Sequence, residues 1–269
     1  MRSNLSLLLL SLLIFITSPA SAEVLVLIHG YHSSGVTWRS SGVIPALQAN
    51  GWTDAGDYPM NPLGKPNASP SKSVVTVTLP SEAPVAYQSL LLGQQLQQIR
   101  QAFPGEPLIL VGHSAGGVIA RYHLVLQPET EVRALITLAS PHLGTAIAEI
   151  GTLASESPLG AAAPFMGLNG INRSRGLYDD LMRERYGSML HWLNRQPHPE
   201  IIWISLVRDS DQTASDDLIV PVYSQDMRNI PALRGSAVSY TVPGGHELSY
   251  NDGLLLADII RHLTPNQQD

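Results

Sequence analysis

Short apolar runs recur along most of the chain and are separated by stretches of mixed polarity. The runs occupy residues 23–30, 73–80, 108–112, 132–140, 201–207 and 237–242. They are rich in valine, isoleucine and leucine, which is typical of strands buried on both faces of a parallel sheet. Each run is too short for an ordinary helix, so we expect six strands.

The stretches between these runs carry apolar residues at helical spacing. Such spacing predicts helices around 36–49 and 86–102, another directly after residue 115, and a closing helix at DGLLLADIIRHL (252–263). Residues 53–73 contain several proline, glycine, asparagine and aspartate residues and are expected to be irregular.

The alternation of strands and helices predicts an α/β fold with a doubly wound, mostly parallel sheet in one domain, residues 23–269. Residues 149–200 lack a clear strand and are too long for a connection in a compact domain, so we expect an inserted cap or lid there. Its amphipathic stretch LYDDLMRERYGSMLHWL suits either a lid that opens toward lipid or a fixed cap packed on the core.

The first 22 residues have the features of a signal peptide. Arg2 precedes the apolar run LLLLSLLIFI, and Ala20-Ser21-Ala22 forms a cleavage site before Glu23. The run is too short to span a membrane comfortably. We therefore expect export, to a periplasm or out of the cell.

The composition of the chain argues against several classes of function and excludes several kinds of site. The net charge is −6 and no basic tract is present, which argues against nucleic-acid binding. The chain contains no cysteine, which excludes disulfides, thiol catalysis and thiolate metal sites. A hydrophobic content of 44% is enough for a sizeable core without such cross-links. Nothing in the pattern indicates a cofactor.

The sequence LILVGHSAGGVIARY (108–122) is the strongest chemical signal. Gly112-His113-Ser114-Ala115-Gly116 matches G-x-S-x-G, and a strand precedes it while a helix follows, as a nucleophile elbow requires. Glycines two residues either side of the serine leave room for a strained turn. The alternative is a structural turn made of small residues. We predict that Ser114 is a nucleophile.

A serine nucleophile needs a general base. His246 follows the last predicted strand on the glycine-rich loop TVPGGHELS, where it can face the elbow. His113 lies inside the elbow, where an orienting or packing role is favoured, and the role of His32 stays open. Four further histidines do not lie at the end of a predicted strand, and we expect them at the surface: His123, His191, His198 and His262.

The base needs an acid that fixes its tautomer. The loop after 201–207 offers Asp209, Asp211, Asp216 and Asp217. Asp217 is preferred because DLIVP places it on a turn four residues before a proline, and Asp216 is the near alternative.

Acyl transfer also needs backbone N–H donors for the developing oxyanion. We expect one from Ala115, directly after the nucleophile, and one from Tyr31, in the loop after the first strand. Gly30 lets this backbone approach a substrate. Four residues near the same sheet edge are candidates to line the pocket: His29, Gly30, His113 and His142.

Several segments together resemble the α/β-hydrolase superfamily, most of all its lipase and PGAP1-like serine acylhydrolase branch. They are VLIHGYHSSG, VGHSAGGVIARYHL, LITLASPHLGT, SDDLIVP and GGHELS, in this order along the chain. The resemblance implies a Ser114–His246–Asp217 triad, with Tyr31 and Ala115 as oxyanion donors. Some secreted relatives also hold a structural calcium through an aspartate shortly after the histidine. Here Glu247, Leu248 and Ser249 follow it and Asp252 comes later, so the sequence does not support that site.

These features together predict a serine carboxylester hydrolase, a lipase or esterase that cleaves lipid-like acyl esters through an acyl-enzyme. Transient contact of the cap with a lipid interface is compatible with this activity. The same residues would also serve an amidase, thioesterase or acyltransferase. A non-catalytic binding protein on this fold is the third possibility, and the complete set of serine, acid and histidine argues against it.

Overall fold

The computed structural model describes residues 23–59, 61–62, 72–149, 173–209 and 219–263. Within these ranges the chain forms an eight-stranded sheet with the order β3-β2-β4-β1-β5-β6-β7-β8. All neighbouring strands pair in parallel except β3, which runs antiparallel to β2 at one edge. The strands are β1 Glu23–Ile28, β2 Trp52–Tyr58, β3 Asn61–Pro62, β4 Lys72–Val77, β5 Leu108–His113, β6 Val132–Leu138, β7 Ile202–Arg208 and β8 Ala237–Val242. The predicted doubly wound, mostly parallel sheet is confirmed.

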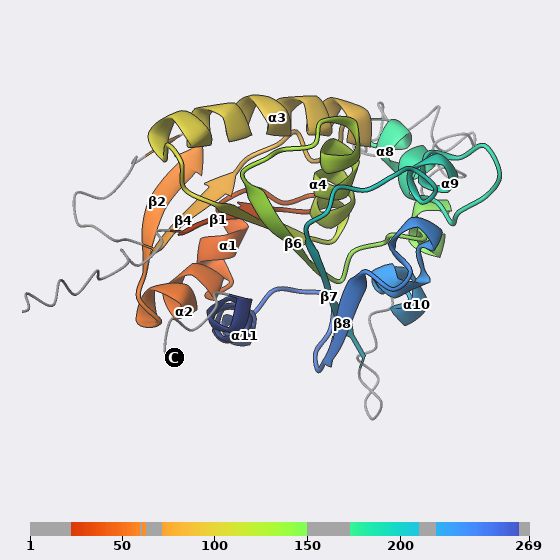
Figure 1. Cartoon of the computed structure of the whole chain (residues 1–269). Coiled ribbons are helices and arrows are strands. Elements are labelled where there is room, and N and C mark those ends of the chain that lie inside the picture. The colour runs from red at the N-terminus through yellow and green to blue at the C-terminus, as the bar shows by residue number, and fades with distance from the viewer. Residues whose placement is uncertain (1–22, 60, 63–71, 150–172, 210–218, 264–269) are drawn as a thin grey trace, which may run out of the picture.

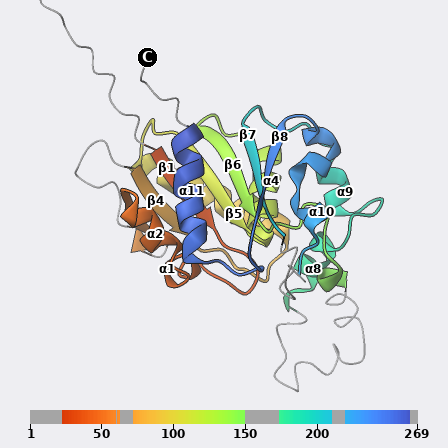
Figure 2. The same cartoon turned by 90° about the horizontal axis from the view of Figure 1, so that it is seen from below.

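Helices cover both faces of the sheet. Helices α3 (Val85–Ala102) and α4 (Ala115–Leu126) lie on one face, and α1 (Thr37–Ser40), α2 (Val43–Ala49) and α11 (Tyr250–Leu263) lie on the other (Figures 1 and 2). Short helices gather at one end of the molecule. They are α8 Arg175–Leu181, α9 Met189–Leu193, α10 Val222–Gln225 and, in 3₁₀ form, Met227–Asn229, with Pro231–Leu233 as a further 3₁₀ turn.

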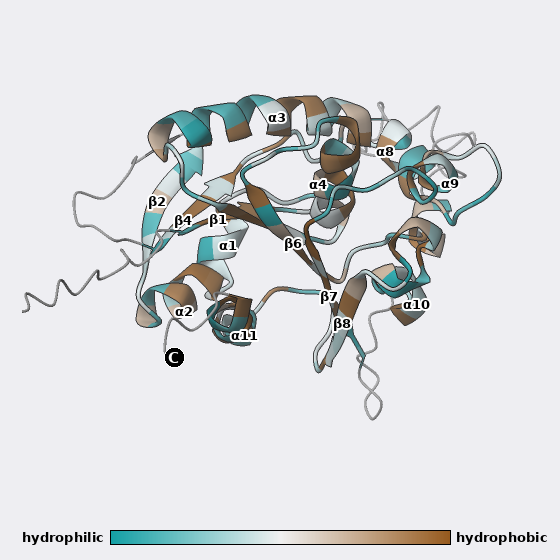
Figure 3. Ribbon diagram, in the orientation of Figure 1, coloured by the Kyte–Doolittle hydropathy of each residue, from teal (hydrophilic) through white to brown (hydrophobic). Residues whose placement is uncertain are grey.

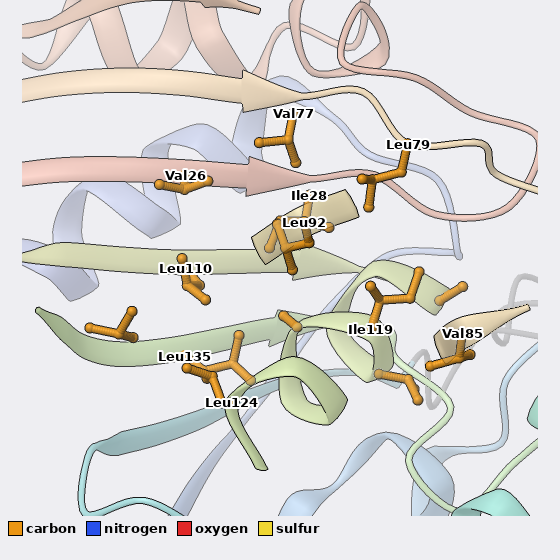
Figure 4. Close-up of a cluster of buried hydrophobic side chains, with 14 of the residues drawn as sticks. Val26, Ile28, Val77, Leu79, Val85, Leu92, Leu110, Ile119, Leu124 and Leu135 are labelled. Carbon is orange, nitrogen blue, oxygen red and sulfur yellow. The ribbon is translucent and has the colours of Figure 1, made fainter. Parts of the chain in front are cut away.

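The apolar runs form strands because a sheet covered on both faces buries the side chains of its central strands. All six residues of β1 and all six of β5 are buried. Figure 3 shows hydrophobic residues along β6 and β7, whereas α3 alternates between hydrophilic and hydrophobic residues. Figure 4 shows side chains of the sheet meeting those of the helices in the core on one face, among them Val26, Ile28, Leu110 and Leu135 with Leu92, Ile119 and Leu124.

The segment expected to be irregular, 53–73, contains a strand. β2 pairs in parallel with β4, with a register shift between Asp54 and Asp57. The Asp57 carboxylate accepts hydrogen bonds from the hydroxyls of Thr76 (2.6 Å) and Thr78 (2.9 Å). The polar residues that indicated a loop are thus satisfied by tertiary contacts, which the local sequence does not reveal.

The helix expected over 36–49 is two helices. Gly42 separates α1 from α2 with φ 90°, a left-handed backbone conformation that glycine adopts at little cost. The stretch LYDDLMRERYGSMLHWL is likewise divided between α8 and α9. It is therefore not one continuous amphipathic lid helix.

The described part of the predicted cap packs on the body of the molecule. Leu177 and Leu181 of α8 and Leu190 and Leu193 of α9 belong to the same buried cluster as the α3 and α4 side of the sheet. Arg121 of α4, which is fully buried, donates from Nη2 to the Asn194 side-chain oxygen at 2.6 Å. Residues 150–172 lie outside the described residues, so the cap as a whole stays a prediction.

The order of the strands determines where a crevice can form. The chain moves from β1 outward to β2 and β3 on one side and returns through β4, then crosses to β5 and continues outward on the other side. Loops after β1 and β5 therefore diverge at the carboxyl ends of these neighbouring strands, the usual ligand position in an open α/β sheet. Tyr31 follows β1 and Ser114 follows β5.

None of the described helices combines the length and the apolar character needed to cross a membrane. The predicted signal peptide, residues 1–22, lies outside the described residues.

Candidate active site

Ser114 lies on a sharp turn between β5 and α4. Its backbone has φ 52° and ψ −128°, in a region that non-glycine residues rarely adopt. Its amide donates to the Leu138 carbonyl of the adjacent strand at 2.9 Å, and its carbonyl accepts from the Gly117 amide at 3.1 Å. The turn is thus held by backbone hydrogen bonds on both sides.

The glycines around this turn are needed for space. A Cβ at Gly112 would lie 2.4 Å from the backbone of Gly117, and a Cβ at Gly116 would lie 2.4 Å from the carbonyl oxygens of Ile28 and His29. No side chain tolerates such distances to backbone atoms. The close packing of strand, turn and helix therefore requires the small residues that the motif contains.

His246 lies opposite the serine, in the loop between β8 and α11. Its Nε2 is 3.0 Å from Ser114 Oγ, a hydrogen-bond distance suited to proton transfer. The two residues are 132 positions apart in the chain, and the fold brings them together.

His113, next to the serine, supports the loop that carries His246. Its Nε2–H donates to the His246 carbonyl oxygen at 2.8 Å, and its ring packs against that of His246 at 5.1 Å between centroids. Trp38 also packs edge-on against the His113 ring, at 6.3 Å between centroids. The expectation that His113 orients or packs within the elbow agrees with this placement.

The loop after β1 packs directly on the elbow. A Cβ at Gly30 would lie 2.8 Å from Ser114 Cβ, so the chain at Gly30 comes as near as it can. Tyr31 follows at once. Among the described residues, no group accepts a hydrogen bond from the backbone N–H of Tyr31 or of Ala115.

The Tyr31 side chain links this loop to α8. Its hydroxyl donates to Ser174 Oγ at 3.0 Å and lies 2.5 Å from the Tyr178 hydroxyl. Desolvation by burial raises the pKa of Tyr31 well above its ordinary value. Tyr31 therefore stays a neutral hydrogen-bonding group at the boundary between the sheet and the predicted cap.

A cavity of about 360 Å³ opens beside the serine. Ser114, His246 and Glu247 lie on its polar side. Most of the remaining lining residues are apolar or aromatic: Tyr31, Ala115, Pro141, Ile147, Ala148, Leu177, Tyr178, Leu181, Ile219 and Val220. Three of these residues, Leu177, Tyr178 and Leu181, come from α8. The sequence analysis assigned this segment to the cap but did not identify its residues as part of the pocket.

The four residues expected to line the pocket do not line this cavity. His29 and His142 are 1% and 0% exposed, and each is held by hydrogen bonds below the site. His113 is turned toward the His246 loop, and Gly30 presents only backbone to the elbow. Their positions at strand ends suggested lining, but parallel strands bury their last residues under the loops that follow.

The other histidines divide between the surface and the interior. His262 is exposed as expected, but His123 is only 1% exposed, with Nε2 3.2 Å from Glu129 Oε1. The surface prediction for His123 is therefore wrong. His198 is partly buried, and desolvation together with the charge of Arg121 lowers its pKa to about 4.

Three of the four candidate acids lie outside the described residues: Asp211, Asp216 and the preferred Asp217. Asp209 is described. It lies one residue beyond β7, with its amide bonded to the Val242 carbonyl at 3.3 Å.

The calcium found in some relatives does not fit the residues present here. Asp252 Oδ1 contacts Arg208 Nη2, and Oδ2 accepts from the Ser249 amide and hydroxyl. A guanidinium at this position repels a cation instead of ligating one. Across the described residues, no group of three or more histidine, cysteine, aspartate or glutamate side chains could hold a metal ion.

Two residues that matter for the site were missed by sequence reasoning. Arg208 and Asp252 form a buried pair beneath the His246 loop, 2.5 Å apart. Ser249-Tyr250-Asn251-Asp252 has the spacing of a helix capping box, a local signal that could have assigned Asp252 to the start of α11. Nothing local indicates Arg208.

Comparison with known families and structures agrees with this architecture. The family model described as alpha/beta hydrolase fold matches residues 23–166. Among curated proteins, no sequence relative matches the chain.

Solved structures share the fold at low identity. The lipase BlEst2 of Bacillus licheniformis in its mature form aligns with a TM-score of 0.62 and 18% identity, over 91% of this chain and 92% of that one. The metagenomic carboxyl esterase MGS0156 aligns at 0.56 and 14%, over 91% and 76% of the two chains. Phospholipase PlaB from Legionella pneumophila aligns at 0.52 and 16%, over 77% of this chain and 46% of that one. At these identities the likeness concerns the fold.

Proposed function

The chain belongs to the α/β-hydrolase fold family, and we propose that it is a serine hydrolase of carboxylic esters. One observation carries the proposal: His246 Nε2 lies 3.0 Å from the Oγ of Ser114, on a turn with φ 52° beside an apolar cavity. A strained turn persists only where the surrounding structure holds it, and such turns cluster at active sites.

In the proposed reaction Ser114 Oγ attacks the acyl carbonyl carbon while His246 Nε2 takes the hydroxyl proton. The tetrahedral intermediate collapses, the ester C–O bond breaks, and the alcohol leaves with the proton from His246. A water molecule then attacks the acyl-enzyme with His246 as base again. The carboxylic acid is released and the serine hydroxyl is restored.

The negative oxygen of the intermediate would be bound by the N–H groups of Tyr31 and Ala115. Ala115 is the first residue of α4, so the helix dipole adds to its N–H. Each preorganised donor of this kind is worth about 3 kcal/mol in the transition state.

Asp217 is the proposed acid that orients His246, with Asp216 as the alternative. The proposal rests on their position between β7 and the cavity residue Ile219 and on the resemblance of SDDLIVP to the acid loop of the family.

The walls of the cavity favour an apolar acyl group over a charged one, because burying a charge there costs desolvation. The packing of α8 and α9 on the core supports a fixed cap in the described part, and hence an esterase that needs no lipid interface. A lipase, an amidase, a thioesterase or an acyltransferase would use the same three residues.

The test is labelling with a fluorophosphonate probe together with turnover of p-nitrophenyl esters of increasing acyl length. The wild type should take the probe and hydrolyse short soluble esters, with no gain above the micelle concentration. Ser114→Ala should abolish labelling and lower kcat by about 10⁶-fold. Probe uptake by Ser114→Ala would remove the serine from its role, and a steep gain at an interface would favour a lipase.

We also propose that the chain is exported after cleavage near Ala22. Mass spectrometry of the protein from a secreting host should find a mature chain that begins at Glu23. An intact amino terminus would contradict this.

A further inference from the structure

Arg208 and Asp252 form an ion pair that is buried beneath the loop carrying His246. Arg208 is the last residue of β7 and Asp252 lies in the first turn of α11. Their side chains are 4% and 3% exposed, and Nη2 lies 2.5 Å from Oδ1. Removing two charges from water is costly, and a buried ion pair often adds no net stability to the folded protein. The place of this pair, directly under the loop of His246, therefore points to a role other than stability.

One further atom of each side chain contacts an end of the same loop. Arg208 Nη1 donates to the Pro243 carbonyl at 3.2 Å. Asp252 Oδ2 accepts from the Ser249 amide at 2.7 Å and from its hydroxyl at 3.0 Å. His246 lies midway between Pro243 and Ser249, so one buried pair anchors the loop on both sides of the proposed base.

The glycines of the loop make its shape dependent on such anchors. Gly244 and Gly245 directly precede His246, and glycine backbones have more freedom to lose than any other residue. Gly244 lies over the guanidinium, since a Cβ there would come within 3.4 Å of Arg208 Nη1. The hydrogen bond from His113 to the His246 carbonyl is a third anchor, at the middle of the loop.

We propose that the Arg208–Asp252 pair is the positioning device of the base, holding His246 Nε2 in line with Ser114 Oγ without touching the substrate. The inference rests on the proposed function, because it assigns a role to the support of the same His246.

The test separates positioning from stability by removing one charge or both. Arg208→Met leaves a buried carboxylate alone and should lower both the thermal midpoint and kcat. In Arg208→Met/Asp252→Asn no buried charge remains, so the midpoint should recover toward the wild type. Its kcat should stay down by about 10²-fold, with KM within about twofold, because a shift of the base by about 1 Å costs that much.

Two further variants provide an intermediate case and a control. Arg208→Lys keeps the charge but cannot reach both Asp252 and Pro243 as the forked guanidinium does, and should fall between the wild type and the double variant. Arg39→Met/Asp54→Asn removes a second arginine–aspartate pair, which joins α1 to β2 with Nη2 2.7 Å from Oδ1 and is more exposed, at 29% and 20%. It should leave kcat unchanged.

Amide hydrogen exchange of residues 244–249 gives a readout that needs no activity. Exchange should be faster in the double variant and unchanged in the Arg39 and Asp54 control. A double variant with wild-type exchange and wild-type kcat would overturn the inference. So would a wild type that loses activity in EDTA and recovers it with calcium, because a metal would then hold the loop.

A wrong assignment of the function itself would give a different experimental result. In that case the wild type itself neither takes the fluorophosphonate probe nor hydrolyses any ester. A wild type active on esters, with every Arg208 variant equally active, overturns only the role of the ion pair.

Discussion

The two reacting side chains are held in place by different forces. Ser114 is positioned by close packing of the chain, with Gly30, Gly112 and Gly116 leaving no room for a Cβ. His246 is positioned by side chains from other elements, through the Arg208–Asp252 pair and His113. Steric packing at these glycines leaves no room for added atoms, whereas the ion pair depends on its charges and on the reach of the guanidinium. The difference predicts which substitutions abolish folding and which only misplace the base.

The largest effect is expected on the serine side, for Gly112→Ala. The new Cβ would lie 2.4 Å from Gly117 Cα and N, and backbone cannot yield as a flexible side chain does. We expect destabilisation of about 3 kcal/mol or more and loss of most of the soluble, active protein. Urea unfolding followed by circular dichroism, together with ester turnover, measures both.

Gly51→Ala is the matched control for that variant. Gly51 has φ 86°, and a Cβ there would meet no atom within 4 Å, so only the backbone penalty of about 1 kcal/mol applies. Equal effects at the two glycines would show that packing at the elbow is not what holds the serine.

A smaller effect is expected on the base side, for His113→Phe. Phenylalanine keeps a ring packed against Trp38 and His246 but cannot donate to the His246 carbonyl. The loss of one hydrogen bond, about 1.4 kcal/mol at most, should lower kcat by up to about tenfold with little change in KM. His262→Phe, at an exposed position, is the control, and steady-state kinetics on a soluble ester give the answer. A change confined to KM would place His113 in substrate binding instead.

The smallest effect concerns pH and His29, below the serine. His29 Nδ1–H donates to the Gly30 carbonyl and Nε2 accepts the Leu79 amide, both at 2.9 Å, so the ring is neutral. Desolvation by burial lowers the pKa of His29 from its ordinary value of 6.5. The unfolded chain therefore binds a proton first as pH falls, and the stability from this residue is complete above about pH 6.5 and is lost below it.

His29→Gln, which keeps an acceptor for the Leu79 amide, should flatten this loss. The slope of unfolding free energy against pH should fall by at most about 1.4 kcal/mol per unit, the contribution of one proton. His262→Gln should keep the wild-type slope in the same urea titrations. An unchanged slope in His29→Gln would mean that other buried histidines, such as His123 and His142, account for the acid sensitivity.

Much of the architecture could be predicted because its signals are local. The apolar runs became β1, β4, β5, β6, β7 and β8, and the strained turn of the motif lies at Ser114. The prediction failed where the hydrogen-bond partner of a polar residue lies on another element of the fold. Asp57 of β2 was expected in a loop, but its carboxylate accepts hydrogen bonds from Thr76 of β4 and from Thr78 just after β4. His123 was expected at the surface, but it is buried and contacts Glu129.

Local sequence was enough to specify the parallel sheet and the serine on its turn, because buried strands and a sterically crowded elbow each demand particular residues at adjacent positions. It also put His246 after the last strand, where a glycine-rich loop can reach the serine. What holds that loop was settled by the tertiary fold alone. Arg208 and Asp252 are 44 positions apart, and an ion pair between such distant residues leaves no local pattern, since its energy depends on the burial that the completed fold supplies.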